Sequence, residues 1–409
     1  MITQRAELTF KGNLRQGRHS WLRLTPAYSV QVVRQLLDGL DNPGRVLDPF
    51  SGTGTTGLVC AERGLTCDLL ELNPFLAWFA QVKTRNYAEA ELAAGWELAQ
   101  AAATQVRDHA DSEQAWVPPI HHIERWWTPE RLATLAGLFH GLQSLRRKQQ
   151  DPALDLALIA FCRAAIEWSN AAFNHQSMSF KDNTPTLFSA NEQDLIVDAF
   201  LANIRQIIAS ARQELPGQVN VRQGDSRRVA DFASGPYDCV ITSPPYPNRM
   251  SYIRELRPYM YWLGYLNEAR EAGDLDWEAI GGTWGVATSR LAQWTPDGVT
   301  VQHDGFDDLI RQIVESSPLL ANYVHKYFVD MLAHLNSLSR VLAPGAKVFY
   351  VVGNSKFYDT LVPVEKIYAS LMAQCGFKNV KSSLLRKRNS KKELYEFVVS
   401  AEWRQRMTE

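Results

Sequence analysis

Hydrophobic positions follow two periods along the chain, and the alternation between them predicts the fold. Short runs predict strands at 45–50, 67–71, 220–225, 237–242 and 347–352. Apolar residues at helical spacing predict helices at 56–63, 74–83 and 363–374, and a long one after Pro318. The first helix is expected to start at Thr25-Pro26, an N-cap followed by proline. Strands alternating with helices are typical of a parallel sheet with right-handed crossovers.

Two stretches depart from this alternation. Alanine- and leucine-rich windows predict a helical insertion, with helices near 88–107, 129–148, 153–170 and 192–213 and a polar loop at 174–186. Residues 264–305, rich in Gly, Trp and acidic residues, are expected to be irregular. Strands at 380–386 and 394–401 predict a terminal hairpin. The sequence therefore predicts a doubly wound α/β core with an antiparallel C-terminal hairpin, divided into 1–85, 86–217 (helical insertion), 218–263, 264–317 (second insertion) and 318–409.

The composition is that of an ordinary globular protein: 409 residues, 45% hydrophobic and 21% charged. With 43 Lys+Arg against 44 Asp+Glu, a uniformly basic nucleic-acid coat is excluded, but a local basic face is not. No apolar stretch reaches the ~20 residues of a membrane span, and the N-terminal residues lack the apolar core of a secretory signal. The five cysteines form no CxxC pair, which favours free thiols in a reducing cytoplasm.

The segment Asp-Pro-Phe-Ser-Gly-Thr-Gly-Thr-Thr at 48–56 lies between a predicted strand and a predicted helix. Its glycines, Gly52 and Gly54, allow the backbone to pass close to a ligand, and open α/β sheets bind ligands at the carboxyl ends of strands. A second acid, Glu71, ends the next strand, where an acid commonly holds ribose hydroxyls. The loop does not match the phosphate-binding P-loop. The alternative interpretation is a tight turn with no ligand.

A second segment, Thr-Ser-Pro-Pro-Tyr at 242–246, directly follows the strand 237–242. Consecutive prolines remove two backbone donors and fix φ, so their carbonyls remain as acceptors in a preset direction. Flanked by the hydroxyl of Ser243 and the ring of Tyr246, they suit a planar base that bears an exocyclic amine. The alternative is a rigid exit from the strand, with Tyr246 filling the core.

Together the two segments resemble the amino-group class of S-adenosylmethionine-dependent DNA methyltransferases, most closely the N4-cytosine type. That family carries an Asp-Pro-Phe-x-Gly-x-Gly loop and a Ser/Asp/Asn-Pro-Pro-Tyr/Phe loop, and Ser is more typical of cytosine N4 enzymes, Asp of adenine N6 enzymes. The resemblance covers 15–85 and 218–262, and 318–402 by pattern only. It implies a Rossmann-like methyltransferase sheet, with a cofactor half in 1–85 and a catalytic loop in 218–263. Which insertion recognises the target is left open.

The resemblance also implies a role for each matching residue. Residues 243–246 match the catalytic loop, and segment 20–29 resembles the motif whose helix closes the cofactor pocket. Asn354 is a weaker match to a family turn. The catalytic residues would be Ser243, Pro244, Pro245 and Tyr246. S-adenosylmethionine, which becomes S-adenosylhomocysteine, would be bound by Asp48, Pro49, Phe50, Gly52, Gly54, Glu71, Asn73, Pro74, Asp225 and Thr25.

The expected reaction is direct methyl transfer to N4 of a cytosine flipped out of duplex DNA and stacked on Tyr246. Cations that follow the catalytic loop or lie at the predicted hairpin tip would contact phosphates. They are Arg249, Arg254, Arg386, Lys387, Arg388, Lys391 and Lys392. The alternative for 386–392 is a solvated hairpin end. The polar loop 174–186 suits either recognition of base edges or a lid.

Several expectations concern partners and alternatives. His121, His122 and His175 lack acids or Cys at ligand spacing, so no metal is expected. An associated restriction endonuclease and a bacterial or archaeal cytosol are expected from the resemblance alone, and the oligomeric state and the target sequence stay open. The alternatives are an N6-adenine DNA methyltransferase, a tRNA or rRNA base-amine methyltransferase, and a catalytically silent nucleic-acid-binding subunit. The intact segment 243–246 argues against the last.

Overall fold

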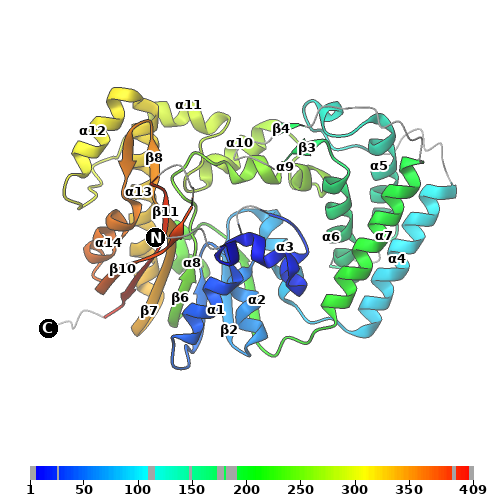
Figure 1. Ribbon diagram of the computed structural model, residues 1–409, viewed down its shortest axis with the longest axis horizontal. Helices are drawn as coiled ribbons and strands as arrows, with labels where there is room; N and C mark the ends of the chain where they lie inside the picture. The colour runs from blue at the N-terminus through cyan, green and yellow to red at the C-terminus, as the bar shows by residue number, and fades with distance from the viewer. Residues whose placement is uncertain are drawn as a thin grey trace.

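A seven-stranded sheet forms the centre of the computed structural model, which describes residues 6–24, 27–108, 116–146, 150–172, 179–180, 191–388 and 393–404 (Figure 1). The strand order is β10 (Lys378–Lys387), β11 (Tyr395–Glu402), β7 (Leu342–Gly353), β6 (Tyr237–Thr242), β1 (Arg45–Asp48), β2 (Thr66–Glu71) and β5 (Gln218–Gln223). The pairs from β7 to β5 are parallel, whereas β11 pairs antiparallel with both β7 and β10. The predicted fold class, a mostly parallel sheet with an antiparallel C-terminal hairpin, is confirmed.

Helices cover both faces of the sheet because successive strand residues point to opposite sides. One face packs Val46, Cys239 and Ile241 under α1 (Val30–Asp38), α2 (Thr55–Glu62) and α3 (Pro74–Thr84). The opposite face packs Leu47 and Val240 under α13 (Pro318–Leu338) and α14 (Val364–Gln374). The core thus consists of three layers, helix on sheet on helix.

The order of the strands reverses beside β1. From β1 the chain continues outward through β2 and β5, and then returns to form β6 on the other side of β1. In open α/β sheets, the crevice at such a reversal, at the carboxyl ends of the strands, is where ligands bind. The two loops singled out in the sequence both begin there, at Asp48 and at Thr242.

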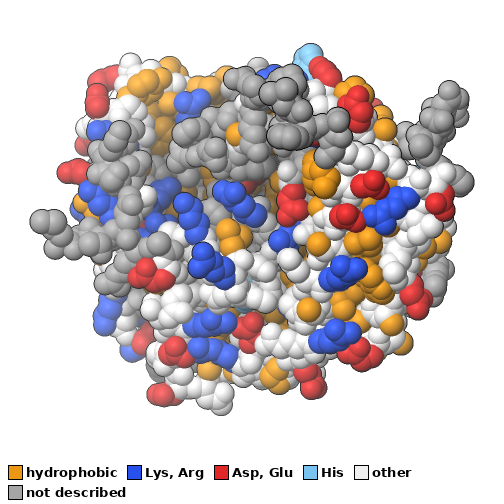
Figure 2. All heavy atoms as spheres, turned by 45° about the vertical axis from the view of Figure 1, so that its right-hand side comes forward, with side chains coloured by type: hydrophobic (Ala, Val, Ile, Leu, Met, Phe, Trp, Pro, Cys, Tyr) orange, Lys and Arg blue, Asp and Glu red, His pale blue; other side chains and the backbone are white. Residues whose placement is uncertain are grey.

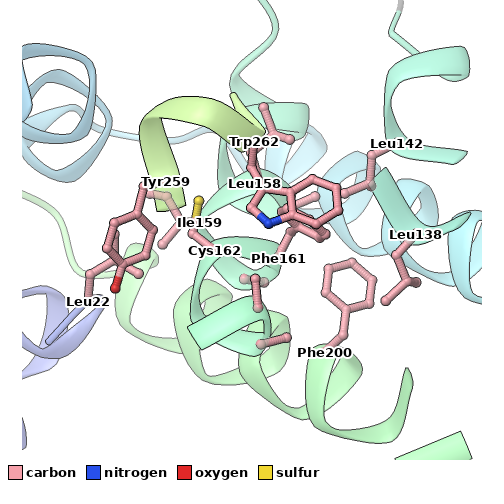
Figure 3. Packing of buried hydrophobic residues seen from close by; sticks show 14 of the residues in the cluster. Leu22, Leu138, Leu142, Leu158, Ile159, Phe161, Cys162, Phe200, Tyr259 and Trp262 are labelled. Atoms are coloured by element: carbon pink, nitrogen blue, oxygen red, sulfur yellow. The ribbon is translucent and has the colours of Figure 1, made fainter. Parts of the chain in front are cut away.

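The predicted helical insertion contains four long helices, α4 (Glu89–Asp108), α5 (Pro129–Ser144), α6 (Pro152–Glu167) and α7 (Glu192–Ala211), which lie together at one end of the molecule (Figure 1). Between α6 and α7 lie the short strands β3 (Ala171–Ala172) and β4 (Ser179–Phe180). The helix that follows the Thr-Ser-Pro-Pro-Tyr segment, α9 (Tyr252–Trp262), ends in the same core. The Trp262 indole packs against Phe161, with their ring centroids 5.1 Å apart (Figure 3).

The second insertion is more regular than expected. It contains α10 (Ala269–Glu278) and α11 (Val286–Gln293), followed by α12 (Phe306–Ser316). A capping box between Glu268 and Glu271 starts α10, and Asp276 anchors its far end by accepting from Ser251 Oγ at 2.6 Å. These helices are short and bury few residues, so too few apolar positions recur at helical spacing for the sequence to predict them.

Three further details differ from the prediction. The first helix begins at Val30, where Ser29 Oγ accepts from the N–H of Gln31, because Ser29 and not Thr25 is its cap. Thr25 and Pro26 lie outside the described residues. β7 starts at Leu342 and so includes Pro344, because the backbone there pairs with the end of β11. The short strands β8 (Ser355–Phe357) and β9 (Thr360–Val362) and the short helix α8 (Val229–Phe232) carried no readable pattern.

Within the described ranges, no helix is both long and apolar enough to cross a membrane.

Candidate active site

The carboxylate of Asp48 joins the two loops at the strand reversal. It ends β1, is fully buried, and accepts hydrogen bonds from Thr56 Oγ1 at 2.5 Å, Thr242 Oγ1 at 2.6 Å and Phe50 N at 3.1 Å. Burial raises the pKa of Asp48 to about 6, although these three donors oppose the shift. These three hydrogen bonds fix the glycine loop to the end of β6.

Two glycines shape the loop between β1 and α2, and a third, Gly57, lies in the first turn of α2. Gly52 and Gly54 have φ of +50° and +70°, where a side chain is strained. A Cβ on Gly54 would lie 2.9 Å from Ala80 Cβ, and one on Gly57 would lie 2.7 Å from Leu69 Cδ1. Gly57 completes a Gly-x-Gly-x-x-Gly pattern at 52–57 that the sequence analysis missed, although its spacing was readable.

Glu71 lies directly beside this loop. It ends β2, is half-buried, and its carboxylate accepts from Gly52 N at 2.7 Å and from Asn73 N at 2.9 Å. Burial raises the pKa of Glu71 to about 7, and the nearby charge of Asp48 adds to the shift. An acid next to a glycine loop, at the end of the adjacent strand, is the arrangement that binds ribose hydroxyls in dinucleotide-binding folds.

The residues after Glu71 have structural partners. Asn73 is the N-cap of α3, its Oδ1 accepting from Phe75 N at 2.9 Å and Leu76 N at 3.3 Å, and Pro74 takes the first helical position. Phe75 is fully buried and stacks on Tyr259, with ring centroids 5.1 Å apart. The structure therefore uses Asn73 and Phe75 for capping and packing at the edge of the candidate cofactor site.

Asp225 lies at the end of the next strand, β5, and is bound by an arginine that the sequence analysis missed. Its carboxylate accepts from Arg227 N at 2.9 Å and forms an ion pair with the Arg227 guanidinium at 2.8 Å. Arg227 also approaches Asp330 of α13 at 3.4 Å. The described partner of Asp225 is thus Arg227, and no sequence pattern signals a pair that is completed by α13.

The Thr-Ser-Pro-Pro-Tyr loop presents two acceptors. Ser243 Oγ donates its proton to Val351 O at 3.1 Å and lies within hydrogen-bond reach of the Tyr246 hydroxyl, whose own proton goes to Glu396, so the lone pairs of Ser243 Oγ stay available. The Pro245 carbonyl accepts from the Tyr327 hydroxyl at 2.8 Å. In the described part of the chain, no donor bonds to the Pro244 carbonyl. Ser243 Oγ and Pro244 O therefore remain to accept from a ligand.

Tyr246 is held on two sides by the C-terminal hairpin. Its hydroxyl donates to Glu396 Oε1 at 2.9 Å, and the Arg388 guanidinium lies over its ring, 4.9 Å from the centroid. Burial and the Glu396 carboxylate raise the pKa of Tyr246 well above its usual value, so the phenol keeps its proton. Tyr246 is half-buried.

The predicted phosphate-binding cations fall into distinct groups. Arg249 is exposed with φ of +62°, and Arg254 is half-buried on α9. Arg386 donates to Glu396 Oε2 at 2.6 Å and Arg388 to Asn354 O at 2.9 Å, so both guanidinium groups have protein partners. Lys387 lies between them on β10, and Lys391 and Lys392 lie outside the described residues. Figure 2 shows one face of the molecule, on which basic side chains lie among acidic ones.

Among the described residues, no group of three or more His, Cys, Asp or Glu side chains is arranged to hold a metal ion. Cys239 of β6 is buried, and burial raises the pKa of its thiol, as expected of a core thiol and not of a nucleophile.

Three curated proteins are similar to the chain over most of its length. The type II methyltransferase M.AvaI from Nostoc sp. is 21% identical, and the alignment covers 92% of this chain and 82% of that protein. M.AvaI from Anabaena variabilis gives the same values. M.BsoBI from Geobacillus stearothermophilus is 20% identical, with 93% and 82% covered.

No protein-family model matches the chain. Among solved structures, the rRNA methyltransferase aviRa from Streptomyces viridochromogenes aligns with 92% of this chain and 86% of its own, at 11% identity and a TM-score of 0.29.

Proposed function

We propose that this chain, a distant homologue of the type II methyltransferases over most of its length, is a site-specific DNA methyltransferase. It transfers a methyl group from S-adenosylmethionine to the exocyclic N4 amine of a cytosine flipped out of duplex DNA. The observation that carries the proposal is the pair of free acceptors, Ser243 Oγ and Pro244 O, which the Asp48–Thr242 hydrogen bond fixes next to the glycine loop.

The residues at the ends of β1 and β2 fit the cofactor. Gly52 and Gly54 turn with positive φ directly before α2, so the loop passes a ligand without a Cβ in the way. Glu71 would accept from the ribose hydroxyls, while the loop 48–54 would surround the methionine part. Pro74 and Asp225 would lie at the adenine end of the cofactor. Arg227, which is paired with Asp225, would then either move away or share the Asp225 carboxylate with the adenine amine. When bound, S-adenosylmethionine supplies a methyl group activated by its sulfonium.

The chain's own residues would prepare the amine. The lone pair of an exocyclic amine is delocalised into the ring, so the nitrogen is a weak nucleophile. Two acceptors, Ser243 Oγ and Pro244 O, would each take one N–H, draw the nitrogen toward a tetrahedral geometry and aim its lone pair at the methyl group. Placement and electrostatics of this kind supply most of the rate. Tyr246 would stack on the flipped base.

Duplex DNA would approach the side of the sheet where both loops lie. Arg249, exposed next to the catalytic loop, and Arg254 on α9 are the proposed phosphate contacts nearest to the reacting amine. Lys387 on β10 is a third. We assign target recognition to the insertions 86–217 and 264–317, and we expect a restriction endonuclease of the same specificity as a partner.

Product analysis tests the proposal. The protein is incubated with labelled S-adenosylmethionine and unmethylated duplex DNA, and the DNA is digested to nucleosides. Label in N4-methylcytosine is the expected result. Label in N6-methyladenine would move the base assignment, label only in RNA would move the substrate, and no label in any nucleic acid would reject the methyltransferase function.

Two variants test the proposed mechanism. Ser243→Ala removes one acceptor, and Pro244→Ala restores the flexibility of the loop. Ser243→Ala is expected to lower the single-turnover rate by ~10- to 100-fold, as for the loss of one hydrogen bond that acts in the transition state. Pro244→Ala is expected to lower the rate less, because the carbonyl stays but is no longer held in one direction. The cofactor dissociation constant should not change. Full activity of either variant with cofactor bound would show that the amine is not held in this way.

A further inference from the structure

The C-terminal hairpin reaches the catalytic loop through Tyr246. Glu396 and Arg388 flank the turn between β10 and β11, and both contact the Tyr246 side chain, at its hydroxyl and over its ring. The hairpin does not need this contact to join the sheet, because β11 pairs with β7 from Glu396 to Glu402. The contact with Tyr246 therefore constrains the Thr-Ser-Pro-Pro-Tyr loop, whereas the hairpin would stay in the sheet without it.

Each member of this contact is itself fixed. Arg386 donates to both oxygens of Glu396, at 2.6 and 3.1 Å, and the Glu396 side chain is buried. Arg388 Nη1 donates to the carbonyl of Asn354. Asn354 in turn binds the return strand, since its Oδ1 accepts from Tyr395 N at 2.8 Å. The two side chains that touch Tyr246 are thus held in place by the backbone and by an ion pair.

The end of β7 makes room for this arrangement. A Cβ on Gly353 would lie 2.5 Å from Arg388 Nη1 and 2.9 Å from the Tyr246 ring, distances that no side chain tolerates. Arg386 and Arg388 act at this place in different ways: Arg386 binds Glu396, and Arg388 lies over the Tyr246 ring. The hairpin thus brings two guanidinium groups to the surroundings of Tyr246.

We propose that Glu396 and Arg388 are positioning residues for Tyr246, which they hold in one orientation before the target base arrives. The base then stacks on the ring face that Arg388 does not cover. Side chains that are ordered only on binding weaken it, and a ring that is already fixed avoids this cost. The inference rests on the proposed function, in which Tyr246 receives the flipped base. It implies that Arg386 and Arg388 support the proposed base-binding residue and do not contact DNA phosphates.

A double-mutant cycle tests the role of Glu396. The single-turnover methylation rate is measured at saturating cofactor for Tyr246→Phe, Glu396→Gln and the double variant. Each single variant is expected to lose ~5- to 20-fold, as for one hydrogen bond to a charged group. The double variant should lose no more than the worse single variant, because both changes act on the same contact: one removes its donor and the other the charge of its acceptor. Losses that multiply would overturn the proposal.

Arg388 is tested by paired substitutions. Arg388→Met keeps the length of the side chain and removes the planar cation, whereas Arg388→Lys keeps the charge without a group that lies flat on a ring. Both are expected to lower kcat by a similar factor and to leave KM for DNA unchanged. Full activity of Arg388→Lys with loss in Arg388→Met would identify a phosphate contact and overturn the positioning role.

A readout that needs no activity separates this inference from the proposed function. Hydrogen exchange of the amides in 246–250 is compared in the cofactor-free protein. Exchange should be faster in Glu396→Gln and in the charge-free pair Arg386→Met/Glu396→Gln, which guards against misfolding around an unpaired arginine. It should not change in Lys381→Ala, an exposed position of β10. Unchanged exchange in both test variants would overturn the inference, even if the wild-type protein labelled no nucleic acid.

Discussion

Glu71 is the residue whose ionisation is expected to control cofactor affinity. Burial raises its pKa to about 7, and ribose hydroxyls would donate to its ionised form. The affinity for the cofactor is therefore highest above this pKa, and it falls as the pH drops through the pKa. We predict that the dissociation constant of S-adenosylmethionine rises about tenfold per pH unit below about pH 7 and is constant above it. Calorimetric titration across this range measures it.

The variant Glu71→Gln supplies the control. It should bind the cofactor more weakly at high pH and show no step near pH 7. A smaller step near pH 6 would remain, because burial raises the pKa of Asp48 to about 6 and protonation of Asp48 weakens the bonds that fix the glycine loop. An affinity in the wild-type protein that does not depend on pH would contradict the ribose-binding role of Glu71.

Lys83 carries a buried charge that the proposed chemistry does not use. Its side chain faces a small cavity that His19 and Thr53 also line, and Nζ lies over the Phe79 ring, 5.2 Å from the centroid. Burial lowers the pKa of Lys83 to about 7. The unfolded chain therefore binds more protons than the folded one between about pH 7 and 10.5, and stability rises with pH across this window.

We predict that Lys83→Met stabilises the protein by ~1–4 kcal/mol near pH 7, because methionine fills the same space without a charge to desolvate. The gain should shrink toward pH 10, where the lysine of the folded protein is neutral. Urea denaturation at several pH values measures the free energy of unfolding. A variant less stable than wild type at pH 7 would show that the charge has a stabilising partner.

Sequence patterns place residues at the ends of strands but do not reveal which groups those residues contact. Strand ends follow from local patterns, which is why Asp48 and Glu71 could be predicted at the ends of two strands and Ser243 directly after a third. Their hydrogen bonds come from far along the chain: Thr242, 194 residues from Asp48, supplies one. The capping role of Asn73 was readable, since Asn before Pro is a common helix start.

At the scale of elements, long periodic segments were predicted well and short ones poorly. α13 carries a buried apolar stripe over about six turns. The four helices of the helical insertion repeat small and apolar residues at helical spacing, so their periods could be recognised in the sequence. The eight residues of α11 give about two turns, too few for a period to emerge among Gly and Trp. The start of α1 was misplaced because Thr25 is followed by a proline, a common helix start, whereas the actual cap, Ser29, comes four residues later without such a signal.

The contact of α2 with β2 gives a prediction at this scale. A Cβ on Gly57 would also lie 3.1 Å from Val219 Cγ1, so Gly57→Ala overpacks the layer between α2 and the sheet. Overpacking costs ~1–3 kcal/mol, against a gain of up to ~1 kcal/mol in helix propensity. We predict a net loss of ~1–2 kcal/mol in the free energy of unfolding.

The matched control for this prediction is Gly39→Ala. Gly39 has an ordinary φ of −82°, and the nearest atom to its Cβ would be 3.5 Å away, so stability should change by less than ~0.5 kcal/mol. Both variants are compared by chemical denaturation. Equal effects in the two would mean that the α2–β2 layer tolerates a methyl group and that Gly57 is not needed for close packing.

At the scale of the whole molecule, the fold concentrates the chemistry on one edge. The strand reversal beside β1 places the glycine loop next to the Pro-Pro loop, and the antiparallel hairpin brings Glu396 and Arg388 to the same edge from the end of the chain. α9 then connects this edge to the helical insertion, where Trp262 is buried. The same helix thus begins close after the Thr-Ser-Pro-Pro-Tyr loop and ends in the core of the helical insertion.

The near balance of 43 basic and 44 acidic residues becomes informative once the charges are placed. Arg386 and Arg388 are bound within the protein, whereas Arg249 is exposed beside the catalytic loop. We predict that Arg249→Gln lowers the magnitude of the slope of log K against log salt for DNA binding by about 0.9, the loss of one phosphate contact. Binding is followed by fluorescence anisotropy with a duplex at several salt concentrations.

Two control variants distinguish a single phosphate contact at Arg249 from a diffuse positive field. Arg388→Met should keep the wild-type slope, because its guanidinium lies over Tyr246 and releases no counterion from DNA. Lys347→Gln should keep it too, since Lys347 lies six residues, ~20 Å of strand, before the carboxyl end of β7. If all three variants reduced the slope equally, a diffuse positive field would bind DNA. If only Arg249→Gln reduces it, a neutral protein binds DNA through cations confined to the edge that carries the catalytic loop.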